Sequence, residues 1–209
     1  MNERIIRGPD CVAEGAVAVA QTDPALAAAI ATLQPLPLRL KPDGFPALLQ
    51  AIVGQQVSVA SANAIWTRVA AAGFNDPAMV QAADDSALQA VGLSRPKVRY
   101  AKALAAAQLP YDALHDMPSA DVIKTLIAVS GIGTWTAEIY AMFSLGRADV
   151  FAHGDLALQE AARMIYKLET RPSEKDMRQM ALRWSPWRAV AARGLWAYYA
   201  AQKRREGVA

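Results

Sequence analysis

This chain of 209 residues is predicted to have an all-α fold, for three reasons. Apolar residues recur three and four positions apart over most of the chain, which is the spacing of one buried helix face. No segment keeps the alternation of apolar and polar residues that marks a half-buried strand. Hydrophobic residues make up 54% of the sequence, enough to bury the core of one domain or of two closely packed helical lobes.

The same spacing separates the predicted helices from the loops. Asp23 is expected to cap the second helix, with Pro24 at its first position, and Ser173 is expected to cap a later one. Residues 34–44 contain three prolines and are predicted to form a connecting loop. Residues 1–10 are predicted as a tail and 110–117 as a connector. The predicted helical segments are 12–20, 25–33, 45–53, 60–72, 77–83, 86–91, 94–108, one that begins at Pro118, 134–145, 156–168, one after Ser173, and 189–202.

The most informative stretch of the sequence is 126–158. An apolar helical pattern stops at Ser130-Gly131-Ile132-Gly133, and a second begins near Thr134. The two glycines allow a tight turn under which Ile132 can pack, and the N–H groups at the start of the second helix would suit a phosphate oxygen. Taken alone, this fragment fits equally well a simple packing corner between two helices.

Composition narrows the class of protein. No apolar run is long enough to span a membrane, and the first ten residues lack a signal-peptide pattern, so we expect a cytoplasmic protein without a membrane partner. One cysteine, Cys11, excludes an internal disulfide and a cysteine-ligated iron–sulfur cluster. Only two histidines, His115 and His153, are present, and we expect no catalytic metal. The net charge of +3 permits nucleic-acid binding without requiring it.

Several motifs together resemble the helix-hairpin-helix DNA glycosylases, and within them most closely the 3-methyladenine DNA glycosylase II group. They are Gly131-Ile132-Gly133-Thr134-Trp135-Thr136-Ala137, Asp149-Val150-Phe151, Gly154-Asp155 and Ser185-Pro186-Trp187-Arg188. The resemblance covers residues 45–199. It implies two closely packed helical lobes with the active-site cleft between them. Residues 1–44 would pack as a tail and helices on a glycosylase core of residues 45–209, whose hairpin lies at about 119–145. Too few residues precede this core for the N-terminal sheet domain that longer members carry.

The resemblance also implies roles for individual residues. Asp155 would be the catalytic aspartate, and Gln56 would fill the gap left by a flipped base. The DNA backbone would be bound by Ser130, Gly131, Ile132, Gly133, Thr134 and Thr136. The base pocket would be lined by Trp135, Trp187, Ile139 and Leu156. Each of these roles has a plainer alternative, since an aspartate after a loop is often an N-cap, a tryptophan at a helix start is often a core residue and glutamines at a helix junction are often a polar turn.

The expected partner is double-stranded damaged DNA, bound by a monomer. No cofactor is expected, and a monovalent cation at the hairpin is left open. Trp135 stands where lyases of the superfamily carry a lysine, so the resemblance implies a monofunctional enzyme. Four basic residues, Arg95, Lys97, Arg99 and Lys102, form either a solvated helix face or a set of phosphate contacts.

One carboxylate is sufficient for the reaction that such an enzyme catalyses. Cleavage of an N-glycosidic bond passes through an oxocarbenium-like sugar, which a carboxylate beside C1′ stabilises. A base alkylated at a ring nitrogen is already cationic and leaves as a neutral molecule, so a second acid is not required. Three hypotheses follow: a glycosylase for alkylated bases, a glycosylase for deaminated bases such as hypoxanthine or uracil, and a DNA-binding helix-hairpin-helix protein without catalysis.

Overall fold

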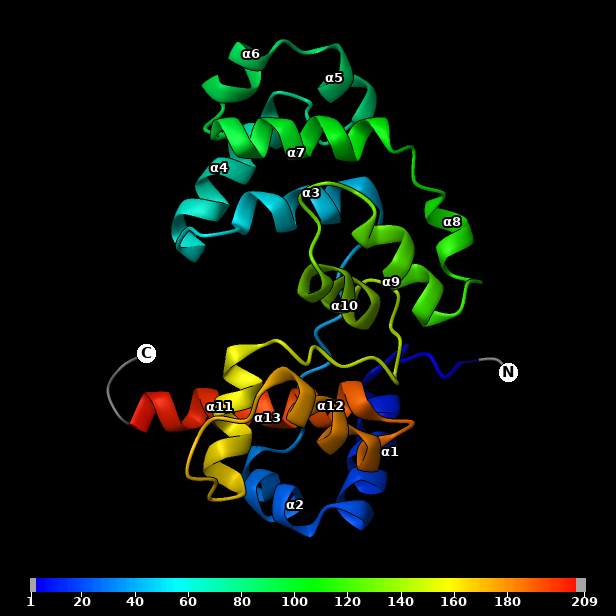
Figure 1. Cartoon of the computed structure of the whole chain (residues 1–209), viewed down its shortest axis with the longest axis vertical. Helices are drawn as coiled ribbons and strands as arrows, with labels where there is room; N and C mark the ends of the chain where they lie inside the picture. The colour runs from blue at the N-terminus through cyan, green and yellow to red at the C-terminus, as the bar shows by residue number, and fades with distance from the viewer. Residues whose placement is uncertain (1–2, 206–209) are drawn as a thin grey trace. The chain divides into compact units, whose positions relative to one another are not determined.

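The computed structural model describes residues 3–205, and its regular structure there is helical (Figure 1). The one β feature among these residues is an isolated antiparallel bridge between Ile5 and Arg147. The predicted all-α fold is confirmed. The chain forms two compact units, one from residues 3–40 with 141–205 and the other from residues 41–140. Residues 1–2 of the predicted tail and residues 206–209 of the predicted core lie outside the described residues.

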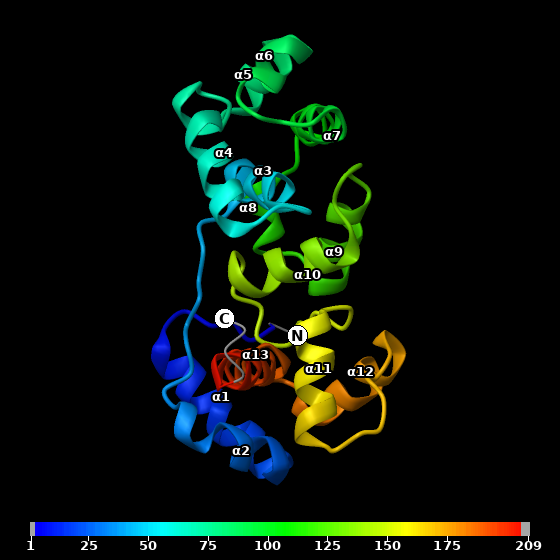
Figure 2. The same cartoon turned by 90° about the vertical axis from the view of Figure 1, so that its left-hand side faces the viewer.

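The first unit is built around its last helix. Both views show α13 lying among α1, α2, α11 and α12, and Figure 2 shows it nearly end-on. Its first half is buried from Ala189 to Leu195, as expected for a helix surrounded by others. The elements of this unit are α1 (Pro9–Thr22), α2 (Pro24–Ile30), the 3₁₀ helix η1 (Ala31–Leu33), α11 (Leu156–Ile165), α12 (Glu174–Met180), the 3₁₀ helix η2 (Ala181–Trp184) and α13 (Arg188–Arg205).

A buried carboxylate ties three parts of this unit together. Asp23 caps α2, as predicted, by accepting a hydrogen bond from the backbone N–H of Leu26. Its other oxygen accepts from the Tyr166 hydroxyl at 2.6 Å and from Trp184 Nε1 at 2.9 Å. Burial and the neighbouring carboxylate raise the pKa of the Tyr166 hydroxyl, which keeps it a donor at neutral pH. Asp23 therefore links α2 to the ends of α11 and η2.

The second unit contains α3 (Gly44–Gly54), α4 (Val59–Ala71), α5 (Pro77–Ala82), α6 (Asp85–Ala90), α7 (Arg95–Ala106), α8 (Tyr111–Leu114) and α9 (Ser119–Ile127). The helix α10 (Thr134–Phe143) begins in it, and the boundary between the units falls inside α10. In Figure 1, α7 lies between the α5–α6 pair and α3. One face of α7 contacts the end of α3 through Lys97 and the turn after α9 through Tyr100.

Local sequence signals predicted most of the helices. The cap predicted at Ser173 is present and forms a capping box with Asp176. The connector predicted at 110–117 instead contains α8, a single turn too short to show a helical period in sequence. The domain boundary predicted at residue 44 stays a prediction, although residues 3–40 belong by contact to the unit that contains residues 141–205.

Replacing Asp23 with alanine is expected to lower the free energy of unfolding by roughly 2 to 4 kcal/mol, because a helix cap and two buried donors lose their acceptor. Urea unfolding measures this loss. The matched control is Asp76→Ala, which removes the same kind of Asp–Pro cap from the exposed start of α5 and should cost about 1 kcal/mol. Equal losses for the two variants would show that the Tyr166 and Trp184 contacts add nothing.

Candidate active site

The predicted helix-hairpin-helix is present, formed by α9, the turn at residues 128–133 and α10. Gly131 has φ +95°, a left-handed conformation, and a Cβ at this position would lie 2.4 Å from Cγ of Tyr100. Ile132 is buried beneath the turn, as expected, and its N–H donates to Val129 at 3.1 Å. The turn therefore requires a glycine at 131 for two reasons, backbone conformation and the ring packed against it.

The outer surface of the turn is formed by Ser130, Gly133 and Thr134, which are exposed. A Cβ built on Gly133 would meet no atom within 4 Å. Since α10 begins at Thr134, the N–H groups of its first turn point out of the helix end, which is the arrangement that binds phosphate oxygens. Thr136 differs from the other predicted backbone-binding residues because it is only 5% exposed, which favours a packing role for its side chain.

Gln56 lies in the loop that follows α3. It has φ +57°, and its side chain is exposed between the end of α3 and Ser58, the N-cap of α4. The adjacent Gln55 instead turns inward, and its Nε2 donates to the carbonyl oxygen of Gly131 at 3.0 Å. The exposed position of Gln56 is compatible with the predicted gap-filling role.

Of the four basic residues on α7, Lys97 does not lie on a solvated helix face. Lys97 is 9% exposed, and its Nζ donates to the carbonyl oxygen of Val53 at 2.7 Å. Burial lowers the pKa of its ammonium group. Lys97 is therefore not part of a solvated face, whereas Arg95 and Arg99 on the same helix are exposed.

Asp155 lies in the first unit, at the N-cap of α11. Its Oδ1 accepts hydrogen bonds from the backbone N–H groups of Ala157 at 2.9 Å and Leu158 at 3.0 Å. The same atom accepts from Nε1 of Trp196 at 3.1 Å. The carboxylate is half-buried, so it is held in one orientation while remaining accessible. The plain alternative, an N-cap, is thus realised, and it is compatible with a catalytic role.

Trp196 is a functional candidate that no motif in the sequence indicates. Its ring lies 5.6 Å from that of Phe143, and the Arg39 guanidinium lies 5.9 Å from its centroid. Arg193, one turn earlier on α13, lies 4.8 Å over the Phe143 ring. The only sequence signal was that an indole N–H near the surface needs an acceptor. Its partner, Asp155, is 41 residues away.

The Ser185-Pro186-Trp187-Arg188 motif supports the loop that leads to Asp155. Arg188 donates to both carboxylate oxygens of Asp149, at 2.7 and 2.8 Å, and the Ser185 hydroxyl donates at 2.9 Å. The ion pair raises the pKa of Arg188. Trp187, predicted in the base pocket, is 4% exposed, with the Arg4 guanidinium 4.5 Å from its ring and Gly15 against it. This surrounding favours a packing role for Trp187.

The other predicted pocket residues are accessible. Trp135 is 46% exposed and Ile139 half-buried, and their spacing of four places them on one face of α10. Leu156, which follows Asp155 in the first unit, is 61% exposed. The base-pocket role of these three residues stays a prediction.

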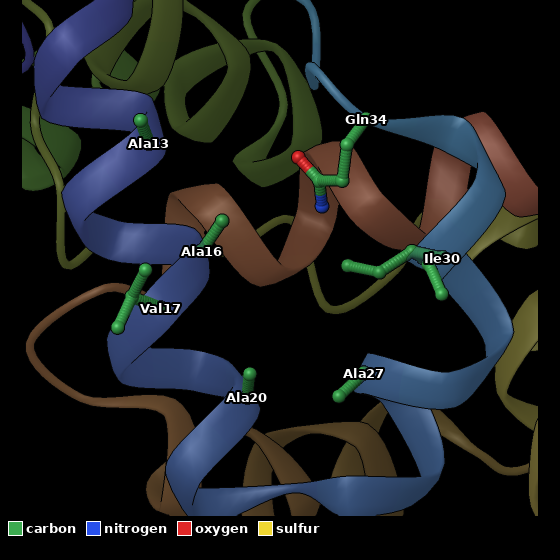
Figure 3. Close-up of a pocket in the computed structure, with 8 residues that line it drawn as sticks. Ala13, Ala16, Val17, Ala20, Ala27, Ile30 and Gln34 are labelled. Atoms are coloured by element: carbon green, nitrogen blue, oxygen red, sulfur yellow. The ribbon is translucent and has the colours of Figure 1, made fainter.

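Two grooves occur within the units, away from these residues. One holds about 390 Å³ between α1 and α2 and is lined mainly by alanine side chains, with Ile30 and Gln34 (Figure 3). The other holds about 420 Å³ beside α5 and α7. Neither is lined by a predicted site residue. Within residues 3–205, no group of three or more His, Cys, Asp or Glu side chains is placed to hold a metal, and no helix is both long and apolar enough to cross a bilayer.

Comparison with known families decides the assignment of the chain. Residues 49–187 match the model of the HhH-GPD superfamily base excision DNA repair proteins. The chain belongs to this superfamily. The matched residues contain Gln56, the hairpin, Asp155 and the first three residues of the Ser185-Pro186-Trp187-Arg188 motif. The family predicted from the sequence is confirmed.

The chain is also similar to several named proteins. DNA-3-methyladenine glycosylase 1 of Schizosaccharomyces pombe is 27% identical over 75% of this chain and 72% of its own. DNA-3-methyladenine glycosylase 2 of Escherichia coli is 31% identical over 74% of this chain. The chain spans 57% of that relative's length and 60% of a Bacillus subtilis relative. The crystal structure of a DNA-3-methyladenine glycosidase from Bacillus halodurans superposes with a TM-score of 0.80 at 29% identity, covering 98% of this chain and 95% of that one.

A Gly131→Ala variant is expected to lose roughly 1 to 3 kcal/mol of unfolding free energy, because the left-handed backbone and the Tyr100 ring both oppose a side chain there. Gly133→Ala, two residues along the same turn, is the control and should change stability little, since its Cβ meets open space. Both values come from urea unfolding. Similar losses at the two positions would contradict the packing described for the turn.

Proposed function

We propose that this protein is a monofunctional DNA glycosylase of base excision repair. It hydrolyses the N-glycosidic bond of alkylated bases of the 3-methyladenine type in duplex DNA and leaves an abasic site. The superfamily and the DNA-3-methyladenine glycosylases among its relatives support this class of reaction. The observation that carries the proposal is the carboxylate of Asp155, which three N–H donors hold in a fixed orientation.

Asp155 acts on the sugar rather than on the base. As the bond between C1′ and the base nitrogen breaks, positive charge develops on C1′ and the ring oxygen, and a carboxylate beside them stabilises it. The bonding electrons leave with the base, so an alkylated cationic base departs neutral. Water then adds to C1′, and its proton passes to Asp155 or to solvent. One preoriented carboxylate is sufficient for this sequence of steps.

The aromatic residues select the base. Trp135 offers an exposed indole whose face can stack on an extruded base and attract a cationic one, an interaction of roughly 0.5 to 2 kcal/mol. Ile139, one turn further along α10, extends this surface with an aliphatic side chain. Weakly paired, damaged bases are favoured further because they cost the least to unstack.

DNA binding uses backbone contacts. The N–H groups at the start of α10 and the exposed hairpin residues hold a phosphate, and Gln56 occupies the space of the flipped nucleotide. The carbon skeleton of a glutamine can fill this space while its amide bonds to the bases left behind. Because Trp135 stands where lyases carry a lysine, no Schiff base forms and the strand is not cut. The enzyme works as an intracellular monomer.

An Asp155→Asn variant is expected to release methylated bases about 100-fold or more slowly, because it removes the charge that stabilises the sugar cation. Asparagine caps a helix as well as aspartate and keeps an oxygen for Trp196, so folding and DNA affinity should be unchanged. Chromatography of the bases released from methylated duplex DNA measures the rate. Thermal melting and a binding titration provide the controls.

The identity of the released base separates the competing hypotheses. Release of hypoxanthine or uracil alone would move the substrate class to deaminated bases. Equal rates for wild type and Asp155→Asn would remove the catalytic role of the carboxylate. Binding without any release by the wild type would favour a non-catalytic DNA-binding protein, and strand cleavage without added base or heat would contradict the monofunctional mechanism.

Trp196→Phe is expected to slow base release by about tenfold, because Asp155 loses a donor to a charged group while the aromatic contact with Phe143 is kept. Single-turnover kinetics measure this rate, and the affinity for DNA should change little. Trp184→Phe, which removes a buried indole donor to Asp23 instead, is the matched control and should lower stability but not the rate in the folded enzyme. Equal rates for Trp196→Phe and wild type would show that the bond does not orient Asp155.

A further inference from the structure

One face of α7 contacts the last turn of α3, which precedes Gln56, and the hairpin turn. Lys97 and Tyr100 lie three residues apart, which places them side by side on the helix surface. Lys97 reaches the end of α3, just before Gln56, whereas Tyr100 lies against the hairpin. A single rigid helix therefore supports the gap-filling loop and the backbone-binding turn.

The contact made by Lys97 is a helix C-cap. The carbonyl oxygen of Val53 belongs to the last turn of α3, where the helix dipole favours a positive charge. The chain leaves the helix at Gln55 and enters the left-handed conformation at Gln56. A buried ammonium at this point is costly unless it has such a partner, so the bond fixes where α3 ends.

The contact made by Tyr100 fixes the hairpin. Its ring carbons would lie 2.4 to 2.9 Å from a Cβ on Gly131, so the ring packs directly against the backbone of the turn. The carbonyl oxygen of the same glycine accepts the hydrogen bond from Gln55. Gly131 is thus contacted both by Tyr100 of α7 and by Gln55, which directly precedes Gln56.

We propose that Lys97, Tyr100 and Gln55 are positioning residues that fix the spacing between Gln56 and the hairpin. We name these three residues the α7 clamp, although only Lys97 and Tyr100 belong to α7 and Gln55 is the C-cap of α3. This inference rests on the proposed function, in which Gln56 fills the DNA duplex while the hairpin holds its backbone. If the spacing is fixed before binding, DNA that has lost a base is bound without the cost of ordering two loops. The α7 clamp thereby sets the preference for DNA with a vacated base position over intact DNA.

The first experiment compares Lys97→Met with Arg99→Met, which removes the same charge from an exposed position on the same helix. Affinities are measured for a duplex with a tetrahydrofuran abasic-site analogue and for the matching undamaged duplex. We expect Lys97→Met to reduce the preference for the abasic duplex by about tenfold or more, the size of one lost hydrogen bond to a charged group. Arg99→Met should keep the wild-type preference.

The salt dependence of binding tests the alternative role for Lys97. A lysine that neutralises a phosphate contributes about 0.9 to the slope of log affinity against log salt concentration. Since Nζ of Lys97 is bonded to Val53, we expect the slope for Lys97→Met to equal that of wild type. A slope reduced by about 0.9 with an unchanged abasic preference would make Lys97 a phosphate contact and overturn its positioning role.

The second experiment uses the other two members of the α7 clamp, which also guards against a Lys97 variant that fails to fold. Gln55→Met removes the donor to Gly131 at constant length, and Tyr100→Leu removes the ring, whereas Tyr100→Phe keeps it. We expect the first two to lose the abasic preference and Tyr100→Phe to retain it. A 2-aminopurine base beside the abasic analogue reports insertion of Gln56 through its fluorescence.

The outcomes separate this inference from the proposed function. Normal abasic preference in Gln55→Met and Tyr100→Leu would overturn the inference even if methylated bases are released. Loss of the preference in these variants would support it even if the wild type releases no base. A wild type that binds abasic and undamaged duplexes equally would overturn it as well, and lowered melting temperatures with an unchanged preference would reduce the three residues to a structural role.

Discussion

In the first unit, the orientation of the Asp155 carboxylate depends on the hydrogen bonds at the start of α11. A helix start needs acceptors for its first N–H groups, and Asp155 provides one oxygen for two of them. The same bonds that stabilise the helix therefore fix the carboxylate in space, so the orientation of the proposed catalytic group needs no strained backbone. Trp196 adds a third donor from α13, directly after the buried first half of that helix. The position of this carboxylate is as rigid as the fold around it.

The loop that leads to Asp155 is fixed by a different interaction, the ion pair between Asp149 and Arg188. Asp149 receives two hydrogen bonds from Arg188, and the carbonyl oxygen of Ala148 accepts from the backbone N–H of Ala189. The motif that resembles the glycosylases thus has a structural explanation, since its arginine and serine hold the chain on its way to Asp155. Its tryptophan packs beneath, against Gly15. A motif can therefore mark a functional family through the residues that support a site as well as through those that act in it.

What the sequence could predict follows from the range of the interactions involved. The cap at Asp23, the capping box at Ser173 and the glycine turn depend on neighbours within a few residues, so their local patterns sufficed. The positions of Lys97 and Trp196 depend on contacts 44 and 41 residues away, which no local period records. Burial of Thr136 and Trp187 likewise depends on which face of a helix meets another element. The family resemblance indicated Asp155 as the proposed catalytic residue, and only the structure showed which residues hold it.

The buried cations show why the net charge of this protein is a weak guide to DNA binding. Lys97 and Arg193 both count toward the total of +3, yet each donates its N–H groups to backbone carbonyl oxygens inside a unit. Burial lowers the pKa of Arg193 to about 10, which still leaves it charged at neutral pH. These charges bond to the last turn of α3 at Val53 and to the loop at Leu38. Attraction to DNA must then come from exposed arginines and from the oriented N–H groups at the start of α10, so the position of each positive group matters more than their sum.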